Sequence, residues 1–183
     1  FYLNINKAHD LLEELKTKSE DLNKDLQTIF PTIYTPRFHK TTNKPLKDHV
    51  DEFNPSSRKQ IAERLQKKYD WVPSKTTPTG LPVIDEKVLK ELEYPEAKMI
   101  AEYLLYEKRV SQIKSWLKNV RDDSKVHGRV ITLGCVTSRM SHYGPNMAQV
   151  PASYSPYGKE CRSLWTIENP DKYCLVGSDA SGL

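Results

Sequence analysis

The chain has 183 residues, 37% of them hydrophobic and 28% charged, and its formal net charge is +4. No window is long and apolar enough to span a bilayer, and no charged start followed by an apolar core marks a signal peptide, so we expect a cytoplasmic protein without membrane contacts. The mild positive charge permits a polyanionic partner without requiring one. Cys135, Cys161 and Cys174 lack CxxC spacing, which indicates reduced thiols rather than a disulfide frame or a zinc site.

The first two thirds of the chain have the periodicity of helices. In residues 1–30 leucines recur at helical spacing among lysines and glutamates, which predicts a long amphipathic helix that ends before Pro31. A second helix is predicted for residues 53–69, where Ser57 and Gln60 have the spacing of a capping box.

Residues 31–52, between these helices, contain three prolines and a basic cluster. We therefore expect an exposed basic loop with little structure of its own. Further along, a short helix is predicted for residues 86–92. A second long helix with a broad apolar face is predicted for residues 95–123, begun by Pro95 near its first turn.

After residue 123 the pattern changes to that of strands. Residues 126–139 alternate β-branched residues with glycine, which predicts paired strands. Residues 141–158 indicate an irregular connection, and residues 159–167 a short helix or strand. The apolar run before Asp179 predicts a final buried strand over residues 173–179. The expected fold class is α+β, with helices first and antiparallel strands after them.

Three features could carry chemistry. The helix start "NPSSR" offers Ser56, Ser57 and unpaired backbone N–H groups to an anion, with the charge of Arg58 beside them, although an ordinary capped helix is the commoner use of such a sequence. A single carboxylate, Asp179, follows the last apolar run, where a helix cap or an ion pair is the commoner role. No second acid lies near it in sequence to complete a metal pair.

The third feature is a basic segment over residues 126–166, with a net charge of +3 before its histidines are counted. Arginines interleaved with amide and tyrosine side chains can bind phosphates, base edges and base faces. A polar surface loop would have the same composition. The residues concerned are Arg129, Arg139, Lys159, Arg162, Asn146, Gln149, Tyr143, Tyr154 and Tyr157.

Seven blocks in order resemble the family A DNA polymerases, which include bacterial DNA polymerase I and the replicative polymerases of short-tailed phages. The blocks are "FNPSSRKQIAERL", "KTTPTGLPVIDEKVLKEL", "EKRVSQ", "VHGRV", "VTSRMSHYGPNMAQVP", "SPYGKECRSLW" and "VGSDASGL". The phage members are the more similar, and the resemblance is weakest over residues 32–52.

The resemblance implies a polymerase architecture. Residues 1–124 would form the helical thumb, with residues 31–52 as an exposed basic loop and residues 53–60 as the thumb tip. Residues 125–183 would begin the palm and end in the strand that carries the catalytic aspartate. The family's thumb grips the duplex of primer and template DNA, so the resemblance turns the "NPSSR" cap into an expected DNA contact.

The resemblance also implies roles for single residues. Arg139 would reach the minor groove at the primer end, where acceptors are present at every correct base pair. Lys108 would lie near the DNA backbone, and Asn146 and Gln149 would follow the template and primer. The full set of expected DNA contacts is Asn54, Ser56, Ser57, Arg58, Lys108, Arg139, Asn146, Gln149 and Arg162.

Asp179 matches the family's first catalytic carboxylate, which binds two Mg²⁺ ions, and the carbonyl oxygen of Ala180 would be a further ligand. One ion activates the primer 3′-hydroxyl, and the other holds the incoming dNTP and stabilises the leaving pyrophosphate.

Some parts depart from the family pattern. The phage relatives that borrow thioredoxin carry a long insertion where this chain has only residues 32–52, so we expect no thioredoxin binding. Tyr154 stands where many members have an arginine. The fingers, the later palm carboxylate and the ribonucleotide-excluding glutamate fall beyond Leu183. We therefore expect the chain to need a C-terminal fingers and palm piece and to be inactive alone.

Two other interpretations remain open at this point. The chain could be a non-catalytic module that binds primer–template duplex by phosphate contacts. It could also be a structural helical protein whose sequence matches the blocks by chance.

Overall fold

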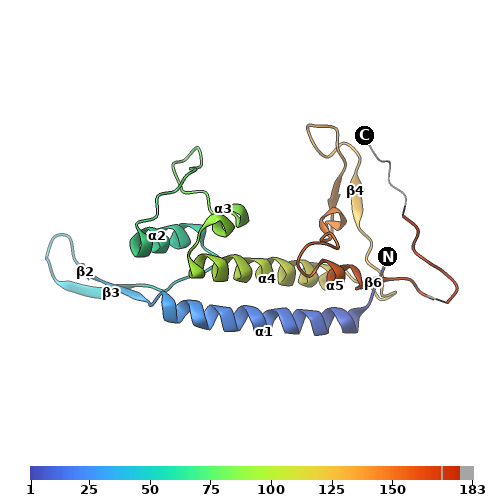
Figure 1. Ribbon diagram of the computed structural model, residues 1–183, viewed down its shortest axis with the longest axis horizontal. Helices are drawn as coiled ribbons and strands as arrows, with labels where there is room; N and C mark the ends of the chain where they lie inside the picture. The colour runs from blue at the N-terminus through green and yellow to red at the C-terminus, as the bar shows by residue number, and fades with distance from the viewer. Residues whose placement is uncertain (170, 178–183) are drawn as a thin grey trace. The chain divides into compact units, whose positions relative to one another are not determined.

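The structure is a computed structural model that describes residues 1–169 and 171–177. The chain divides into two units, of which unit 1 comprises Phe1–Lys16 and Lys108–Leu183, and unit 2 comprises Thr17–Glu107. The long helices α1 (Ile5–Ile29) and α4 (Pro95–Lys118) each contribute to both units. Helices combine with antiparallel strand pairs, which confirms the α+β class (Figure 1). The boundary between thumb and palm near residue 124 stays a prediction.

Unit 2 consists of helices around one apolar core, with a strand pair attached. Besides parts of α1 and α4 it contains β2 (Ile33–Phe38), β3 (Pro45–Asp51), α2 (Arg58–Tyr69) and α3 (Glu86–Glu91), so all the helices predicted here are present. The core brings together buried residues of α1, α2, α3 and α4 and of the segments that flank these helices: Leu26, Phe30, Phe53, Ile61, Leu65, Trp71, Ile84, Leu89 and Ile100.

The segment expected to be a loop without structure is an antiparallel hairpin, so this part of the prediction was wrong. Ile33, Tyr34 and Thr35 pair with Asp51, Val50 and His49, because β-branched and aromatic residues favour the pleated conformation. The register shifts between Thr35 and Arg37, so that Pro36, which has no N–H to donate, lies at the irregularity. Residues 34–50 are all exposed, as the composition indicated.

A hydrogen-bonded carboxylate joins α2 to α4 inside unit 2. Glu96, in the first turn of α4, is nearly buried and accepts hydrogen bonds from Lys68 Nζ at 2.6 Å and from the Tyr69 hydroxyl. The Tyr69 ring stacks on Tyr94, with 3.9 Å between ring centroids. Because the two donors come from the last turn of α2, their bonds fix where that helix ends against α4.

We expect this contact to make unfolding pH-dependent in acid. Burial works to raise the pKa of Glu96, but the hydrogen bonds from Lys68 and Tyr69 outweigh it and hold the pKa below the ordinary 4.5. A carboxyl with a depressed folded pKa stabilises the fold above about pH 4.5, and this stability is lost as the pH falls through the folded value. In alkali, the hydrogen bond to Glu96 and, to a smaller extent, burial raise the pKa of Tyr69 from 10.0 to about 12. The stability that the protonated Tyr69 hydroxyl contributes to the fold is therefore lost as the pH rises through that interval.

The measurement is urea unfolding of the chain between pH 3 and 7. Glu96→Gln should flatten the acid side of the stability profile, because the amide carries no titrating proton. Glu93→Gln removes the same charge from an exposed position and serves as the control. An acid profile of Glu96→Gln that overlays the unaltered chain would show that Glu96 does not cause the dependence.

Unit 1 packs the start of α1 and the end of α4 against the last third of the chain. β1 (Tyr2–Leu3) pairs with β6 (Trp165–Thr166), next to α5 (Gly158–Arg162). Trp116 of α4 is buried and meets the Trp165 ring edge-on, with 5.3 Å between centroids. The remaining elements are β4 (Arg129–Ile131), its partner β5 (Ser141–Tyr143) and the 3₁₀ turn η1 (Met147–Gln149).

Two of the strand predictions need correction. Within residues 126–139 only residues 129–131 form a strand, which pairs with β5 rather than within the segment, because turns occupy residues 132–133 and 136–137. Residues 173–177 are not a strand, and Leu175 and Val176 are 56% and 88% exposed. An apolar run becomes a buried strand only beside a pairing strand, and within residues 1–169 and 171–177 no segment pairs with it. The segment predicted as a short helix or strand contains both, as α5 and β6.

Cys135, Cys161 and Cys174 are free, and burial, the largest influence, raises the pKa of the Cys161 thiol to about 11. Among the residues that the structure describes, no helix is both long and apolar enough to cross a membrane.

Candidate nucleic-acid interface

The expected thumb tip is a capped helix start whose polar groups are largely engaged with one another. The Ser57 hydroxyl accepts a hydrogen bond from Gln60 N at 3.4 Å, and the Gln60 side chain accepts one from Asn54 N at 2.6 Å. The Asn54 side chain in turn accepts from Ser56 N at 2.9 Å. The cap therefore uses Asn54, Ser57 and the N–H of Ser56 to shape the turn, while the Ser56 and Arg58 side chains are exposed to solvent.

A cleft of unit 1 brings together two residues that the sequence predicted separately. Lys108, on α4, and Gln149, at the end of η1, both line this cleft of ≈ 330 Å³. The other lining residues are Arg109, Gln112, Pro151 and Ser155. Because no carboxylate lines it and the Lys108 side chain is exposed, the cleft presents a cation and an amide to an incoming group.

The wall of this cleft is fixed by side chains that hydrogen-bond to backbone carbonyl groups. Arg109 is buried and donates to the Pro156 carbonyl from Nε at 3.3 Å and from Nη2 at 3.2 Å. Its Nη1 donates to the Gln112 side chain at 3.0 Å, and Gln112 Nε2 donates to the Gln149 carbonyl at 2.9 Å. Two residues of α4 thus hold both ends of residues 149–156.

Arg162 also supports this segment, by donating from Nε to the Pro151 carbonyl at 2.8 Å. The segment closes tightly on α5, because a Cβ atom at Gly158 would lie 1.8 Å from the Ala152 carbonyl oxygen. Only glycine fits there without a shift of the backbone. The structural part played by Arg162 was not expected from the sequence, and its predicted DNA contact is untested.

Arg139 and Asn146 lie near the β4–β5 hairpin. Arg139 is exposed in the connection between the two strands, and its carbonyl accepts a hydrogen bond from Cys135 N at 3.2 Å. Asn146 caps η1, where its side chain accepts from Ala148 N at 3.1 Å. Both belong to unit 1 together with Lys108, Gln149 and Arg162, whereas Asn54, Ser56, Ser57 and Arg58 belong to unit 2.

The predicted metal ligands Asp179 and Ala180 lie outside the described residues. Among the residues that are described, no three His, Cys, Asp or Glu side chains are grouped so as to hold a metal ion.

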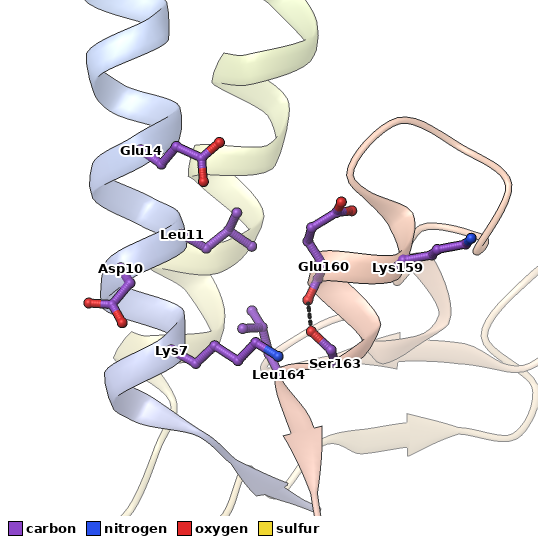
Figure 2. A pocket seen from close by; sticks show the side chains of 8 residues that line it. All are labelled: Lys7, Asp10, Leu11, Glu14, Lys159, Glu160, Ser163 and Leu164. Carbon is purple, nitrogen blue, oxygen red and sulfur yellow. Dashed lines mark hydrogen bonds between the residues drawn. The ribbon is translucent and has the colours of Figure 1, made fainter.

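A second hollow of unit 1, of ≈ 440 Å³, lies between the start of α1 and α5 (Figure 2). Figure 2 shows Lys7, Asp10 and Glu14 on one side and Lys159 and Glu160 on the other. The Ser163 hydroxyl donates to the Glu160 carbonyl at 2.7 Å. Since its lining mixes both signs of charge and, apart from Lys159 of the basic segment, includes no predicted residue and none of the expected DNA contacts, this hollow does not have the character of a polyanion site.

Sequence reasoning missed Arg109 and Gln112 as supports of the interface. A signal was present, because Arg109 occupies the helical stripe of Tyr106, Ile113 and Trp116, all of which are buried. A charged residue in an apolar stripe needs hydrogen-bond partners from another segment. What the sequence could not give was the identity of the partner, the Pro156 carbonyl, which lies 47 residues further along the chain in a proline-rich connection.

The comparisons with known proteins agree with this architecture. The model of DNA polymerase family A matches residues 13–183. The chain is 42% identical over 152 residues to the DNA-directed DNA polymerase of Escherichia phage T7, which covers 74% of this chain and 21% of the phage protein. DNA polymerase I of Helicobacter pylori is 32% identical over 133 residues, covering 71% of this chain and 14% of that protein.

A solved structure is also similar. The POL domain of Pol1 from M. smegmatis, in complex with DNA primer-template and dNTP, has a TM-score of 0.73 and 16% sequence identity, covering 90% of this chain and 26% of that one. The fold is thus that of a polymerase domain. The chain belongs to DNA polymerase family A, and it spans about a fifth of the length of the phage relative.

Proposed function

We propose that the chain is the thumb and the first part of the palm of a DNA-directed DNA polymerase, and that it holds primer–template DNA for nucleotidyl transfer. The observation that supports this most is the family match over residues 13–183, which includes every predicted contact. The cleft with Lys108 and Gln149 adds a chemical reason, since it offers a cation and an amide on a wall held by Arg109 and Gln112.

In this proposal phosphate contacts position the duplex, and Arg139 probes the minor groove at the primer end. Lysine and arginine neutralise backbone phosphates, so affinity falls with salt. An arginine in the minor groove meets acceptors that every correct pair provides, and it therefore senses pairing geometry rather than sequence.

Asp179 is the proposed carboxylate for Mg²⁺, with the Ala180 carbonyl beside it. Carboxylate and carbonyl oxygens are the donors that Mg²⁺ prefers, so the two residues fit the ion. When bound, Mg²⁺ supplies charge stabilisation for attack on the dNTP and departure of pyrophosphate. In this proposal the chain contributes Asp179 and the Ala180 carbonyl to the metal site and holds the primer end of the DNA. A C-terminal fingers and palm piece would supply the rest, and the proposal includes no thioredoxin.

Arg58→Ala tests the DNA contact at the thumb tip. We expect weaker binding of a primer–template duplex and a plot of log K against log salt that is flatter by about one unit, because one phosphate contact is lost. Fluorescence anisotropy of the chain with labelled duplex at several salt concentrations measures both quantities.

Lys87→Ala is the control, since it removes one exposed cation from α3 in the same unit. An Arg58→Ala slope equal to that of Lys87→Ala would count against the tip contact. No binding of duplex by the unaltered chain at low salt would count against the proposed function as a whole.

A non-catalytic module for duplex binding is the second candidate. It is favoured because many of the predicted residues are expected DNA contacts, whereas Asp179 is the single carboxylate proposed for metal. Both candidates predict the same binding results, and they differ only in what Asp179 does in a complete enzyme.

A further inference from the structure

The β2–β3 hairpin is an exposed ribbon that no part of the proposed function uses. Its strands are joined at a tip of residues 39–44, and in Figure 1 it leads away from the C-terminal end of α1. Tyr34 and Phe38 are 65% and 56% exposed. A two-stranded ribbon with both faces open is marginally stable by itself, so its surface suits a partner.

Charge is unevenly distributed along this ribbon. Between residues 37 and 47 there are four cations, Arg37, Lys40, Lys44 and Lys47, and no carboxylate. Among the described residues none of the four has an ion-pair partner. The distal part of the hairpin therefore carries uncompensated positive charge.

The acidic end of the ribbon is its root, where it is attached to α2. The Asp51 carboxylate accepts from Gln60 Nε2 at 2.9 Å and pairs with Arg64 at 3.3 Å. Gln60 also holds the turn that precedes Arg58. The hairpin is thus fixed to the same helix start that is proposed to touch DNA.

A hollow at the root of the hairpin carries further cations, beyond residues 33–36 and 48–51, which contain no Lys or Arg and include Asp48 and Asp51. This hollow, of ≈ 290 Å³, is lined by Ile33 of the hairpin and by Arg64, Lys67 and Lys68 of α2, and no acidic residue lines it. The remaining lining residues are Ile29, Phe30 and Pro31. Arg64 and Lys68 are paired with Asp51 and Glu96, so Lys67 is the cation that this hollow adds to the four of the distal hairpin.

The register separates two faces of the ribbon. Thr35 and Arg37 are two residues apart on β2, whereas their partners His49 and Leu46 are three apart on β3, so the extra residue of the bulge is on β3. Side chains on β2 alternate between faces, which puts Arg37 on the face opposite to Tyr34 and Phe38.

The turn at the tip of the hairpin is shaped by His39, whose Nδ1 accepts hydrogen bonds from Thr41 N and Thr42 N, both at 3.3 Å.

We propose that the β2–β3 hairpin is a second DNA contact, which binds the phosphate backbone of the primer–template duplex beyond the segment gripped at Arg58. The inference rests on the proposed function for the presence of duplex DNA, and on the charge and attachment of the ribbon for its role. A strand of six residues spans about 20 Å. This equals about six base pairs of duplex at the 3.4 Å rise per base pair.

The test is duplex binding by a variant in which Arg37, Lys40, Lys44 and Lys47 are all changed to Gln. For the unaltered chain, affinity should rise as the duplex is lengthened by about six base pairs. The variant should lose this gain, and its salt slope should be flatter by two to four units, roughly one per phosphate contact. Anisotropy with a series of duplex lengths gives both readouts.

Two controls separate the hairpin from general charge and from unfolding. Changing Lys75, Lys87, Lys90 and Lys98 to Gln removes four exposed cations elsewhere in unit 2 and should keep the length-dependent gain. Changing Lys40, Lys44 and Lys47 to Arg keeps the charge and should keep both the gain and the slope. Circular dichroism of each variant checks that the helices are intact.

Each outcome decides the proposal. The hairpin contact would be overturned if the hairpin variant and the unaltered chain had equal salt slopes and an equal dependence of affinity on duplex length. Loss of duplex binding in Arg58→Ala in the same experiments would leave the proposed function standing. No duplex binding by the unaltered chain would overturn both. Unchanged DNA binding, combined with loss of binding to polyglutamate as a probe, would assign the hairpin to an acidic protein instead and overturn the DNA contact.

Discussion

Asp179→Ala, in a complete polymerase that contains this chain, is expected to abolish primer extension while leaving the affinity for primer–template nearly unchanged. The carboxylate is proposed to hold metal at the reacting phosphate and not to contact the duplex. Its loss therefore removes transition-state stabilisation without removing a phosphate contact. Several kcal/mol of such stabilisation correspond to a fall in rate on the order of 10³-fold or more.

The measurement pairs two assays on the same variant. Single-turnover extension with Mg²⁺ reports the chemical step, and anisotropy with labelled primer–template reports binding. Asp171→Ala removes another carboxylate eight positions earlier in the chain and should retain extension. Extension at an unaltered rate in Asp179→Ala would refute the catalytic role and favour the non-catalytic binding module.

The lone chain gives a second readout on the same question. We expect no extension by the chain alone and extension after addition of a C-terminal fingers and palm piece. Synthesis by the lone chain would contradict the proposed dependence on that piece.

Arg109→Ala should destabilise unit 1 more than any exposed substitution on α4. The buried guanidinium makes two bonds to the Pro156 carbonyl and one to Gln112. Hydrogen bonds to charged groups contribute about 1.5–3 kcal/mol, and the lost side chain leaves space in the apolar stripe. We expect the free energy of unfolding to fall by about 2–4 kcal/mol.

Lys108 supplies a matched control from the adjacent position. Lys108→Ala removes an exposed cation and should change stability by at most about 0.5 kcal/mol, while it lowers affinity for duplex DNA. Arg109→Lys keeps the charge but loses the planar donor group, so its stability should lie between those of Arg109→Ala and the unaltered chain. Urea unfolding distinguishes the three.

Hydrogen exchange adds a local readout of the same substitution. In Arg109→Lys the amides of residues 152–158 should exchange faster, because this segment loses its attachment to α4. Unchanged exchange there, or equal midpoints for Arg109→Ala and Lys108→Ala, would show that the guanidinium does not hold the segment.

The helices of this chain could be predicted from local sequence because their information is local. Leucine spacing, the Ser57 and Gln60 cap and Pro95 each act within one helix, and the corresponding helices are present. The cap differs in one detail, because the Gln60 side chain accepts from Asn54 N and donates to Asp51, a residue of β3. That second bond depends on the hairpin and could not be predicted from the cap alone.

Strand pairing could not be predicted to the same extent because it depends on a neighbour. The sequence of β4 is typical of a strand, but its partner β5 comes from a segment with the composition of a loop. Residues 173–177 are apolar and yet exposed, because composition alone does not supply a pairing strand. Likewise Pro36 and Pro45 suggested a loop, whereas the bulge and the start of β3 accommodate them.

The candidate site shows the same division. The family blocks single out the polar residues that are expected to contact DNA, and Lys108 and Gln149 of this set line one cleft. The residues that hold the wall of that cleft act through backbone carbonyl groups, so they leave no pattern of complementary side chains in the sequence. Finding them requires the fold, since only the fold shows which carbonyl group lies beside Arg109.

The irregularity at Pro36 has a consequence for the behaviour of the protein in solution. An exposed two-stranded ribbon presents unpaired N–H and C=O groups along both edges, to which a second copy could add a strand. Proline at positions 36 and 45 removes two donors, the bulge twists the edge, and the cations of the tip repel one another between copies. The hairpin is thereby protected against edge-to-edge aggregation.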